Sequence, residues 1–204
     1  VLGRVSGGNS CEGATNRPMK ITTAILREAG LPRAYADSRP LNIETAELGD
    51  PGDGELLVEI KAAGLCHSDL SVIDNNRPRP LPMALGHEAA GVVRAVGRGV
   101  ADLAEGDHVV LVFVPSCGGC LPCATGRPAL CEPGAAANAQ GTLLSGARRI
   151  DTENGTVNHH LGVSAFSSHI VVDRKSAVKV PRDLPFTEAA LFGCAVLTGV
   201  GAAF

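Results

Sequence analysis

Four of the seven cysteines in this chain lie close together, at Cys117, Cys120, Cys123 and Cys131. Four thiolates complete the tetrahedral coordination of Zn²⁺, and short Cys-x2-Cys steps let one turn present two sulfurs to one ion. An iron–sulfur cluster also uses four cysteines, but its usual run ends in Cys-x3-Cys, whereas the last gap here has seven residues. Disulfides are the third interpretation and require oxidation. We predict a structural zinc lobe over residues 115–133, because four protein ligands leave no position for a substrate.

A second group of metal-binding residue types is divided between two segments. Cys66 and Asp69 lie in the first, and His87 and Glu88 lie in the second. Each segment borders a predicted strand, so side chains from separate parts of the chain can converge. Cysteine and histidine are common zinc ligands, and an aspartate often orients a ligating histidine. Cys66 as a small core residue and His87 as a structural histidine are equally compatible with the local sequence. The local sequence leaves both interpretations open.

The elements that must position these residues are predicted mainly as strands. β-branched or alternating apolar residues occur in five segments, at 57–62, 89–96, 108–113, 166–172 and 177–180. Turn residues separate these segments, and few convincing helices lie between them. The pattern favours a β-barrel or a β-sandwich.

Three further segments have a different character. Residues 133–160 lack periodicity and predict a long surface or active-site loop. Residues 187–193 predict a short helix that ends at a glycine. The small apolar residues 195–204 predict the start of a buried helix, within which the sequence ends.

The composition excludes several classes of protein. Of the 204 residues, 45% are hydrophobic and 19% charged, which is too apolar for a disordered chain. The net charge of −3 and the scarcity of aromatic residues argue against a nucleic-acid partner. No apolar run is long enough to predict a membrane span. The polar residues 1–18 lack the apolar core of a signal peptide, and we expect them to form a disordered leader.

Four motifs together resemble those of the zinc-dependent alcohol dehydrogenases, in the medium-chain dehydrogenase/reductase family. The family signature is similar to the pattern Gly86-His87-Glu88-x2-Gly91-x5-Gly97-x2-Val100. Its first-ligand motif resembles Gly-Leu-Cys-His-Ser-Asp at 64–69, and its last-ligand segment resembles residues 192–203. The cysteine lobe matches the structural-zinc lobe of the family in number, spacing and order. The resemblance extends from about residue 19 to residue 204.

The resemblance implies a mainly β fold with short helices, of class α+β. It is a GroES-like, partly open β-barrel over residues 19–204, with the four-cysteine lobe inserted. In this family a Rossmann domain for the cofactor follows the barrel, but no Gly-x-Gly-x-x-Gly after a predicted strand occurs in this sequence. We therefore expect the chain to stop before the cofactor domain and to be inactive by itself.

The resemblance also assigns the residues of a catalytic site. It implies a catalytic zinc held by Cys66, His87 and Cys194, with the fourth position free for water or the substrate oxygen. Ser68 corresponds to the hydroxyl that passes the alcohol proton towards solvent. Asp69 corresponds to the carboxylate that orients His87.

Further roles follow from the same resemblance. Glu88 lies behind the zinc in similar proteins. His67 corresponds to a contact with the cofactor pyrophosphate, and Thr198 to one with the nicotinamide. The remaining histidines match no ligand position and are predicted to be non-catalytic: His108, His159, His160 and His169.

The function implied is an NAD(P)-dependent oxidoreductase that interconverts an alcohol with an aldehyde or ketone. It would carry two Zn²⁺ ions per chain and use NAD or NADP. The long loop resembles that of relatives acting on primary or aromatic alcohols or glutathione adducts. The alternative is a non-enzymatic, zinc-binding GroES-like module. We expect a small-molecule substrate, a cytoplasmic location and a homo-oligomeric full-length protein, without nucleic-acid or membrane partners.

Overall fold

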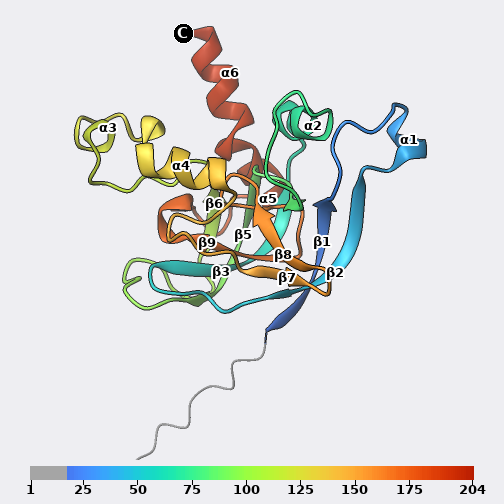
Figure 1. Ribbon diagram of the computed structural model, residues 1–204. Helices are drawn as coiled ribbons and strands as arrows, with labels where there is room; N and C mark the ends of the chain where they lie inside the picture. The colour runs from blue at the N-terminus through green and yellow to red at the C-terminus, as the bar shows by residue number, and fades with distance from the viewer. Residues whose placement is uncertain (1–17) are drawn as a thin grey trace, which may run out of the picture.

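The computed structural model describes residues 18–204, and two β-sheets form the body of the protein (Figure 1). The predicted leader lies outside the described residues except for Pro18. Most of the regular structure is strand, joined by short helices. The predicted mainly β fold is confirmed.

Five strands pair in a ring in the first sheet. In order around the ring they are β1 (Met19–Leu26), β2 (Leu41–Leu48), β7 (Ile150–Thr152), β8 (Gly155–His159) and β4 (Met83–Ala84). β1 and β2 are antiparallel along their full length. β4 pairs in parallel with β8 and returns to β1, which closes the ring.

The second sheet is antiparallel and has β5 at its centre. Its order is β10 (Ala177–Lys179), β6 (His108–Leu111), β5 (Ala89–Val96), β3 (Glu55–Ala63) and β9 (His169–Asp173). The strands predicted at 57–62 and 89–96 are confirmed. Those predicted at 108–113 and 177–180 end slightly earlier, and the one predicted at 166–172 begins only at His169.

Side chains that alternate along β3 pack into the apolar clusters of both sheets and so join the two sheets. Leu56 and Val58 are fully buried in the apolar cluster of the second sheet. Leu57, between them, packs against the cluster of the first sheet, which includes Ile25 and Leu48. Successive side chains of a strand point to opposite faces, so β3 contributes to both cores. The result is the partly open barrel that the resemblance implies.

Residues 133–160 are not the unstructured loop that the sequence predicts. They contain most of α4 (Glu132–Gln140) and all of β7 and β8. α4 lacks an amphipathic pattern, and specific hydrogen bonds hold it instead. The Cys131 sulfur accepts from the Gly134 N–H, and the Asn138 amide donates to the Phe113 carbonyl at 2.8 Å. Such contacts leave no periodic signal in the sequence.

β1 and β2 are also absent from the predicted strands. Their apolar residues alternate over only part of each strand, because one end of each faces solvent. Ile43 in β2, for example, is 71% exposed. The pairing of the two strands, a long-range feature, compensates for the weak local pattern.

Short helices occupy most of the connections. In addition to α4 they are α1 (Tyr35–Ser38), α2 (His67–Ile73), α3 (Leu121–Ala124), η1 (Pro128–Leu130), η2 (Arg174–Ser176), α5 (Phe186–Ala189), η3 (Ala190–Gly193) and α6 (Ala195–Ala203). The helix predicted at 187–193 is confirmed as α5 and η3.

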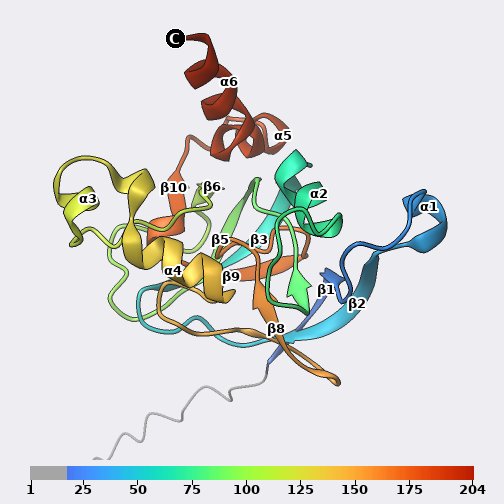
Figure 2. The same cartoon turned by 45° about the horizontal axis from the view of Figure 1, so that its top comes forward.

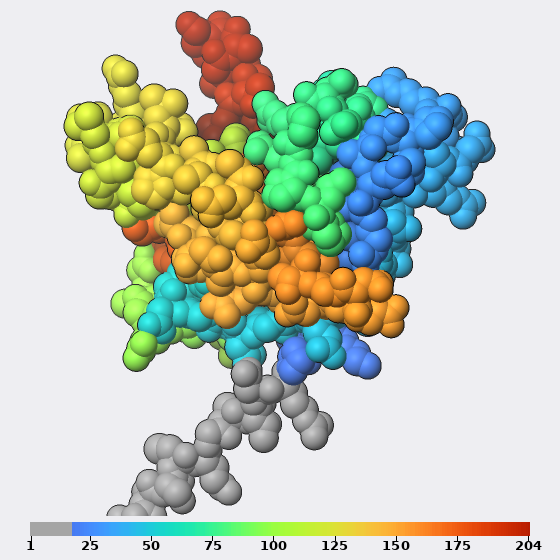
Figure 3. Space-filling model, viewed as in Figure 1, coloured from blue at the N-terminus to red at the C-terminus, as the bar shows by residue number. Residues whose placement is uncertain are grey.

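The prediction that residues 195–204 are buried is wrong. α6 has no buried residue, and Leu197 is 63% exposed. The helix stands clear of the barrel, so beyond its first turn it has no core to pack against within the described residues (Figures 2 and 3). No single helix in residues 18–204 is long and apolar enough to cross a membrane. Phe186–Gly193 and α6 reach that length only as a pair, which is bent by 57°.

A substitution at Gly91 tests the close approach of β3 and β5. A Cβ at Gly91 would lie 2.2 Å from the Glu59 carbonyl oxygen. We expect Gly91→Ala to lower the free energy of unfolding by about 1–3 kcal/mol in denaturant titrations, because the backbone must shift. Gly201→Ala is the control, since a Cβ there meets nothing within 4 Å and alanine favours a helix. Equal stability of both variants would contradict the close approach.

Candidate metal centres

Cys66, His87 and Cys194 converge from three separate parts of the chain. Cys66 is the residue before α2, His87 lies two residues before β5, and Cys194 joins η3 to α6. One ligand atom from each lies within 4.8 Å of the others, and the two sulfurs are 3.9 Å apart. His87 and Cys194 are buried, and Cys66 is half-buried. The structure thus brings together the three residues that the resemblance assigns to the catalytic zinc.

Glycines permit the tight backbone beside two of these residues. Gly86 has φ +91°, and a Cβ there would lie 2.6 Å from the Phe166 nitrogen. A Cβ at Gly193 would lie 2.2 Å from the Leu111 carbonyl oxygen. The absence of a side chain at each position therefore lets His87 and Cys194 enter the same buried space.

The two thiols differ in their electrostatic environment. Burial disfavours a thiolate at Cys66, but hydrogen bonds from Ser68 outweigh it and hold the pKa of this thiol below its ordinary value. Burial and the nearby Cys66 raise the pKa of Cys194 to about 11. The protein groups alone therefore stabilise one thiolate but not two. A divalent cation would remove this repulsion, and two thiolates with an imidazole suit zinc.

Asp69 connects the imidazole of His87 to the protein interior. One oxygen, Oδ1, lies 3.2 Å from His87 Nδ1 and accepts from the Gly86 N–H at 3.1 Å. This leaves Nε2 of His87 as the nitrogen free to bind a metal. Burial disfavours the Asp69 charge, but contacts with His160 and His87 hold the pKa of its carboxyl well below its ordinary value. The arrangement agrees with the orienting role that the resemblance implies for Asp69.

His160 is the site residue that the sequence did not indicate. Its Nδ1 lies 3.1 Å from the same oxygen of Asp69, and its ring meets His87 edge-on. His160 matches no ligand position of the family and is predicted to be non-catalytic. No local pattern distinguishes it from its neighbour His159, so only the fold reveals this contact.

Glu88 ties the barrel to the helix that follows Cys194. Its Oε1 accepts a hydrogen bond from the Ala195 N–H at 3.0 Å, and the side chain is buried. Cys194 precedes α6 but provides no side-chain cap. Glu88 therefore caps this helix from a distant part of the sequence, which fixes the backbone beside the Cys194 sulfur.

The remaining predicted residues lie on the exposed side of this cluster. Ser68 is in the first turn of α2, where it helps to lower the pKa of Cys66. His67 is exposed, and the Ser71 hydroxyl lies 3.3 Å from its Nδ1. Thr198 is exposed on α6, and its backbone N–H donates to the Cys194 carbonyl at 3.0 Å. All three therefore stand beside the two cysteines, where a bound molecule could reach them.

Four further cysteines form a separate cluster: Cys117, Cys120, Cys123 and Cys131. Their sulfurs all lie within 4.8 Å of one another. Backbone N–H groups point at two of the sulfurs, including Cys117 N–H to the Cys131 sulfur at 3.2 Å. Hydrogen bonds from Gly119 and Cys120 lower the pKa of Cys117 to about 6.

A backbone hydrogen bond from Gly118 favours the Cys123 thiolate, but burial and contacts with the neighbouring cysteines outweigh it and raise the pKa of Cys123 to about 12. Of the four residues only Cys131 is buried, so little apolar packing holds the lobe. Its backbone is attached to the barrel by Lys175, which donates to the Cys117 carbonyl. The donor set and the lack of a core both fit a structural zinc ion.

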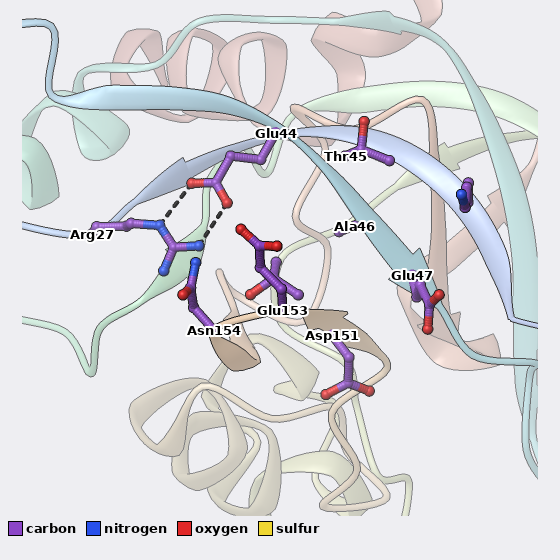
Figure 4. A pocket seen from close by; sticks show the side chains of 10 residues that line it. Arg27, Glu44, Thr45, Ala46, Glu47, Asp151, Glu153 and Asn154 are labelled. Atoms are coloured by element: carbon purple, nitrogen blue, oxygen red, sulfur yellow. Dashed lines mark hydrogen bonds and ion pairs between the residues drawn. The ribbon is translucent and has the colours of Figure 1, made fainter.

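Two cavities among the described residues are lined by none of these ligands. The larger, of about 720 Å³, is polar and lies beside β1, β2 and β7, where Arg27 pairs with Glu44 (Figure 4). The smaller, of about 360 Å³, is an apolar groove between β6, β10 and the helices that end the chain, and it includes Phe192 and Leu197.

The Glu88 contact can be tested by amide hydrogen exchange. We expect Glu88→Ala to speed exchange at the first turn of α6 about fivefold, which corresponds to the loss of a cap of about 1 kcal/mol. Glu88→Gln retains an acceptor oxygen and should leave exchange close to that of the parent. Glu188→Ala, an exposed glutamate in α5, is the matched control. Unchanged exchange in Glu88→Ala would contradict the capping role.

Comparison with known proteins places this geometry in a family. Residues 52–182 match the family model described as the alcohol dehydrogenase GroES-like domain. The chain is 41% identical over 190 residues to the NDMA-dependent alcohol dehydrogenase of Amycolatopsis methanolica, covering 89% of this chain and 46% of that protein. The chain therefore spans about half the length of the curated relatives it matches.

Solved structures give the same result. An alcohol dehydrogenase zinc-binding domain protein from Burkholderia ambifaria superposes with a TM-score of 0.81 at 39% identity, covering 90% of this chain and 48% of that one. Benzyl alcohol dehydrogenase from Acinetobacter calcoaceticus superposes with a TM-score of 0.79 at 33% identity, covering 91% and 48%. The chain belongs to the zinc-type alcohol dehydrogenases of the medium-chain dehydrogenase/reductase family, and it carries their GroES-like N-terminal domain.

Proposed function

We propose that this chain is the catalytic part of a zinc-dependent oxidoreductase that interconverts an alcohol with an aldehyde or ketone, using NAD or NADP. The convergence of Cys66, His87 and Cys194 carries this proposal. Three protein ligands suit a catalytic zinc because they leave one coordination position for another molecule. A purely structural module has no need for such an open set, which disfavours the non-enzymatic alternative.

The side chains of this site have distinct tasks. When bound, zinc supplies a Lewis acid for the substrate oxygen and NAD(P) supplies the hydride acceptor or donor. Asp69 keeps a proton on Nδ1 of His87, so that Nε2 is available to the metal. We propose that Ser68 passes the alcohol proton towards solvent.

The exposed residues of the site face the side where a cofactor would bind. We propose that His67 contacts the cofactor pyrophosphate and that Thr198 contacts the nicotinamide; both are exposed beside the cysteine pair. The four-cysteine cluster would hold a second zinc ion, with a structural role. The neighbour named a benzyl alcohol dehydrogenase makes aromatic alcohols the first substrates to test. We also propose a cytoplasmic, homo-oligomeric full-length protein.

A metal count tests the two sites separately. We expect two zinc ions per chain by mass spectrometry of the purified protein. Cys66→Ala should lose one ion and Cys120→Ala the other, because each removes a ligand from one cluster only. Cys11→Ala is the matched control, since this cysteine belongs to neither set, and it should retain both ions. One ion in the parent chain, retained in Cys66→Ala, would overturn the catalytic-zinc proposal.

A turnover measurement tests the need for a cofactor domain. Residues 18–204 contain no parallel sheet of the Rossmann kind; within them only β4 and β8 pair in parallel. We expect the 204-residue chain alone to oxidise benzyl alcohol with NAD⁺ at least about 10²-fold more slowly than the same chain fused to a relative's dinucleotide-binding domain, because the cofactor is not positioned. The same fusion carrying Cys66→Ala should be inactive. Equal rates for chain and fusion would refute this expectation.

A further inference from the structure

His160 makes a contact that none of the roles above uses. It is 1% exposed, and its Nδ1 lies 3.1 Å from Asp69 Oδ1. Its ring is perpendicular to the ring of His87, with 5.5 Å between centroids. Asp69, His87 and His160 therefore form a compact, fully buried group on the inner side of the open cysteine cluster.

The backbone of His160 is fixed independently of the other two residues. Its N–H lies 3.2 Å from the Ala84 carbonyl and 3.1 Å from the Ser164 hydroxyl, and its carbonyl accepts from the Val163 N–H at 3.0 Å. His160 follows directly after β8, whereas Asp69 lies in α2 and His87 lies just before β5. The first sheet thus supplies a rigid support for a contact with α2.

The carboxylate of Asp69 is used asymmetrically. Gly86 and His87 hydrogen bond to Oδ1, and His160 Nδ1 lies 3.1 Å from the same oxygen. Neither Oδ2 nor His160 Nδ1 has a hydrogen-bond partner of good geometry among the described residues, so both are buried polar atoms that this short contact brings together. A buried carboxylate requires compensating donors, and it moves if a better set is available. With only Gly86 and His87 as partners, the carboxylate could tilt and lengthen its contact with His87 Nδ1. The nearby nitrogen of His160 opposes that tilt.

We propose that His160 is a positioning residue for the open metal site, which acts by holding Asp69 Oδ1 against His87 Nδ1. With a proton on its Nδ1, His160 attracts this oxygen across the 3.1 Å contact, an electrostatic interaction rather than an aligned hydrogen bond. Asp69 is then held in one orientation, and His87 presents Nε2 to the two cysteine sulfurs. This inference rests on the proposed function only in that the open cluster must bind a metal.

A pair of amide variants separates this role from simple space filling. An asparagine places its side-chain nitrogen near the Nδ1 position of histidine, whereas a glutamine places it near the Nε2 position. His160→Asn should therefore preserve the N–H group beside Asp69, and His160→Gln should not. His159→Gln is the matched control, because His159 is equally buried but accepts from the Arg149 N–H, away from the Asp69 cluster.

The readout is zinc affinity at each of the two sites, measured by chelator competition on the 204-residue chain. We expect His160→Gln to weaken the open site by about 10–100-fold, the usual effect of removing a partner behind a metal ligand. The four-cysteine site is the internal reference and should not change. His160→Asn and His159→Gln should remain within about threefold of the parent at both sites.

Each other outcome has a definite meaning. Parent-like affinity of the open site in His160→Gln would overturn this inference and leave the proposed function standing. Equal weakening by His160→Gln and His159→Gln would also overturn it, since the effect would then be general. A parent chain without an open-site ion would overturn the proposed function, and this inference with it.

A second measurement applies to the parent chain and does not depend on any variant folding. In ¹H–¹⁵N spectra of the zinc-loaded chain labelled at histidine, His160 should carry its proton on Nδ1. A proton on Nε2 instead would leave Asp69 without this attraction and would overturn the inference.

Discussion

The repulsion between closely spaced thiolates is the constraint on which the rest of this structure depends. Cys66 and Cys194 place their sulfurs 3.9 Å apart, and the four-cysteine lobe brings four sulfurs within 4.8 Å. In both clusters the protein groups lower the pKa of one thiol and leave another protonated, so neither set is fully ionised by the protein alone. The donor sets of both clusters therefore suit a cation, with four cysteines in one and three side chains in the other.

The fold meets this constraint by bringing distant segments to a common point. Gly86, next to His87, lies close against Phe166. Gly193, next to Cys194, lies close against Leu111. Two buried carboxylates complete the assembly from behind. Asp69 binds the imidazole, and Glu88 caps the helix that begins after Cys194. A change in packing that shifts any of these segments therefore also shifts a predicted metal-ligating side chain. In this way, barrel packing is coupled to the geometry of the site.

The same assembly explains the unusual exposure of α6. Its first residue is anchored by Glu88, but its apolar side chains beyond that turn have no cover within the described residues. The relatives are about twice as long as this chain. The open cluster lies at the base of this helix, with His67 and Thr198 exposed beside it. The proposed cofactor side of the site is thus the side from which α6 leaves the barrel.

The sequence by itself indicated the family and most strands of the second sheet, and it predicted the two ligand sets, with Cys194 assigned only by the family resemblance. Cysteine spacing, the glycine-rich signature around His87 and the apolar runs at 57–62 and 89–96 are local patterns, and local patterns survive in a single sequence. Only the tertiary structure decided the roles of α4, Glu88 and His160. α4 is held by individual hydrogen bonds rather than by an apolar face. Glu88 caps a helix 107 positions away, and His160, directly after β8, lies beside Asp69 of α2. These contacts join residues that are remote in sequence, so no periodicity or spacing encodes them; the pairing of the strands brings them together.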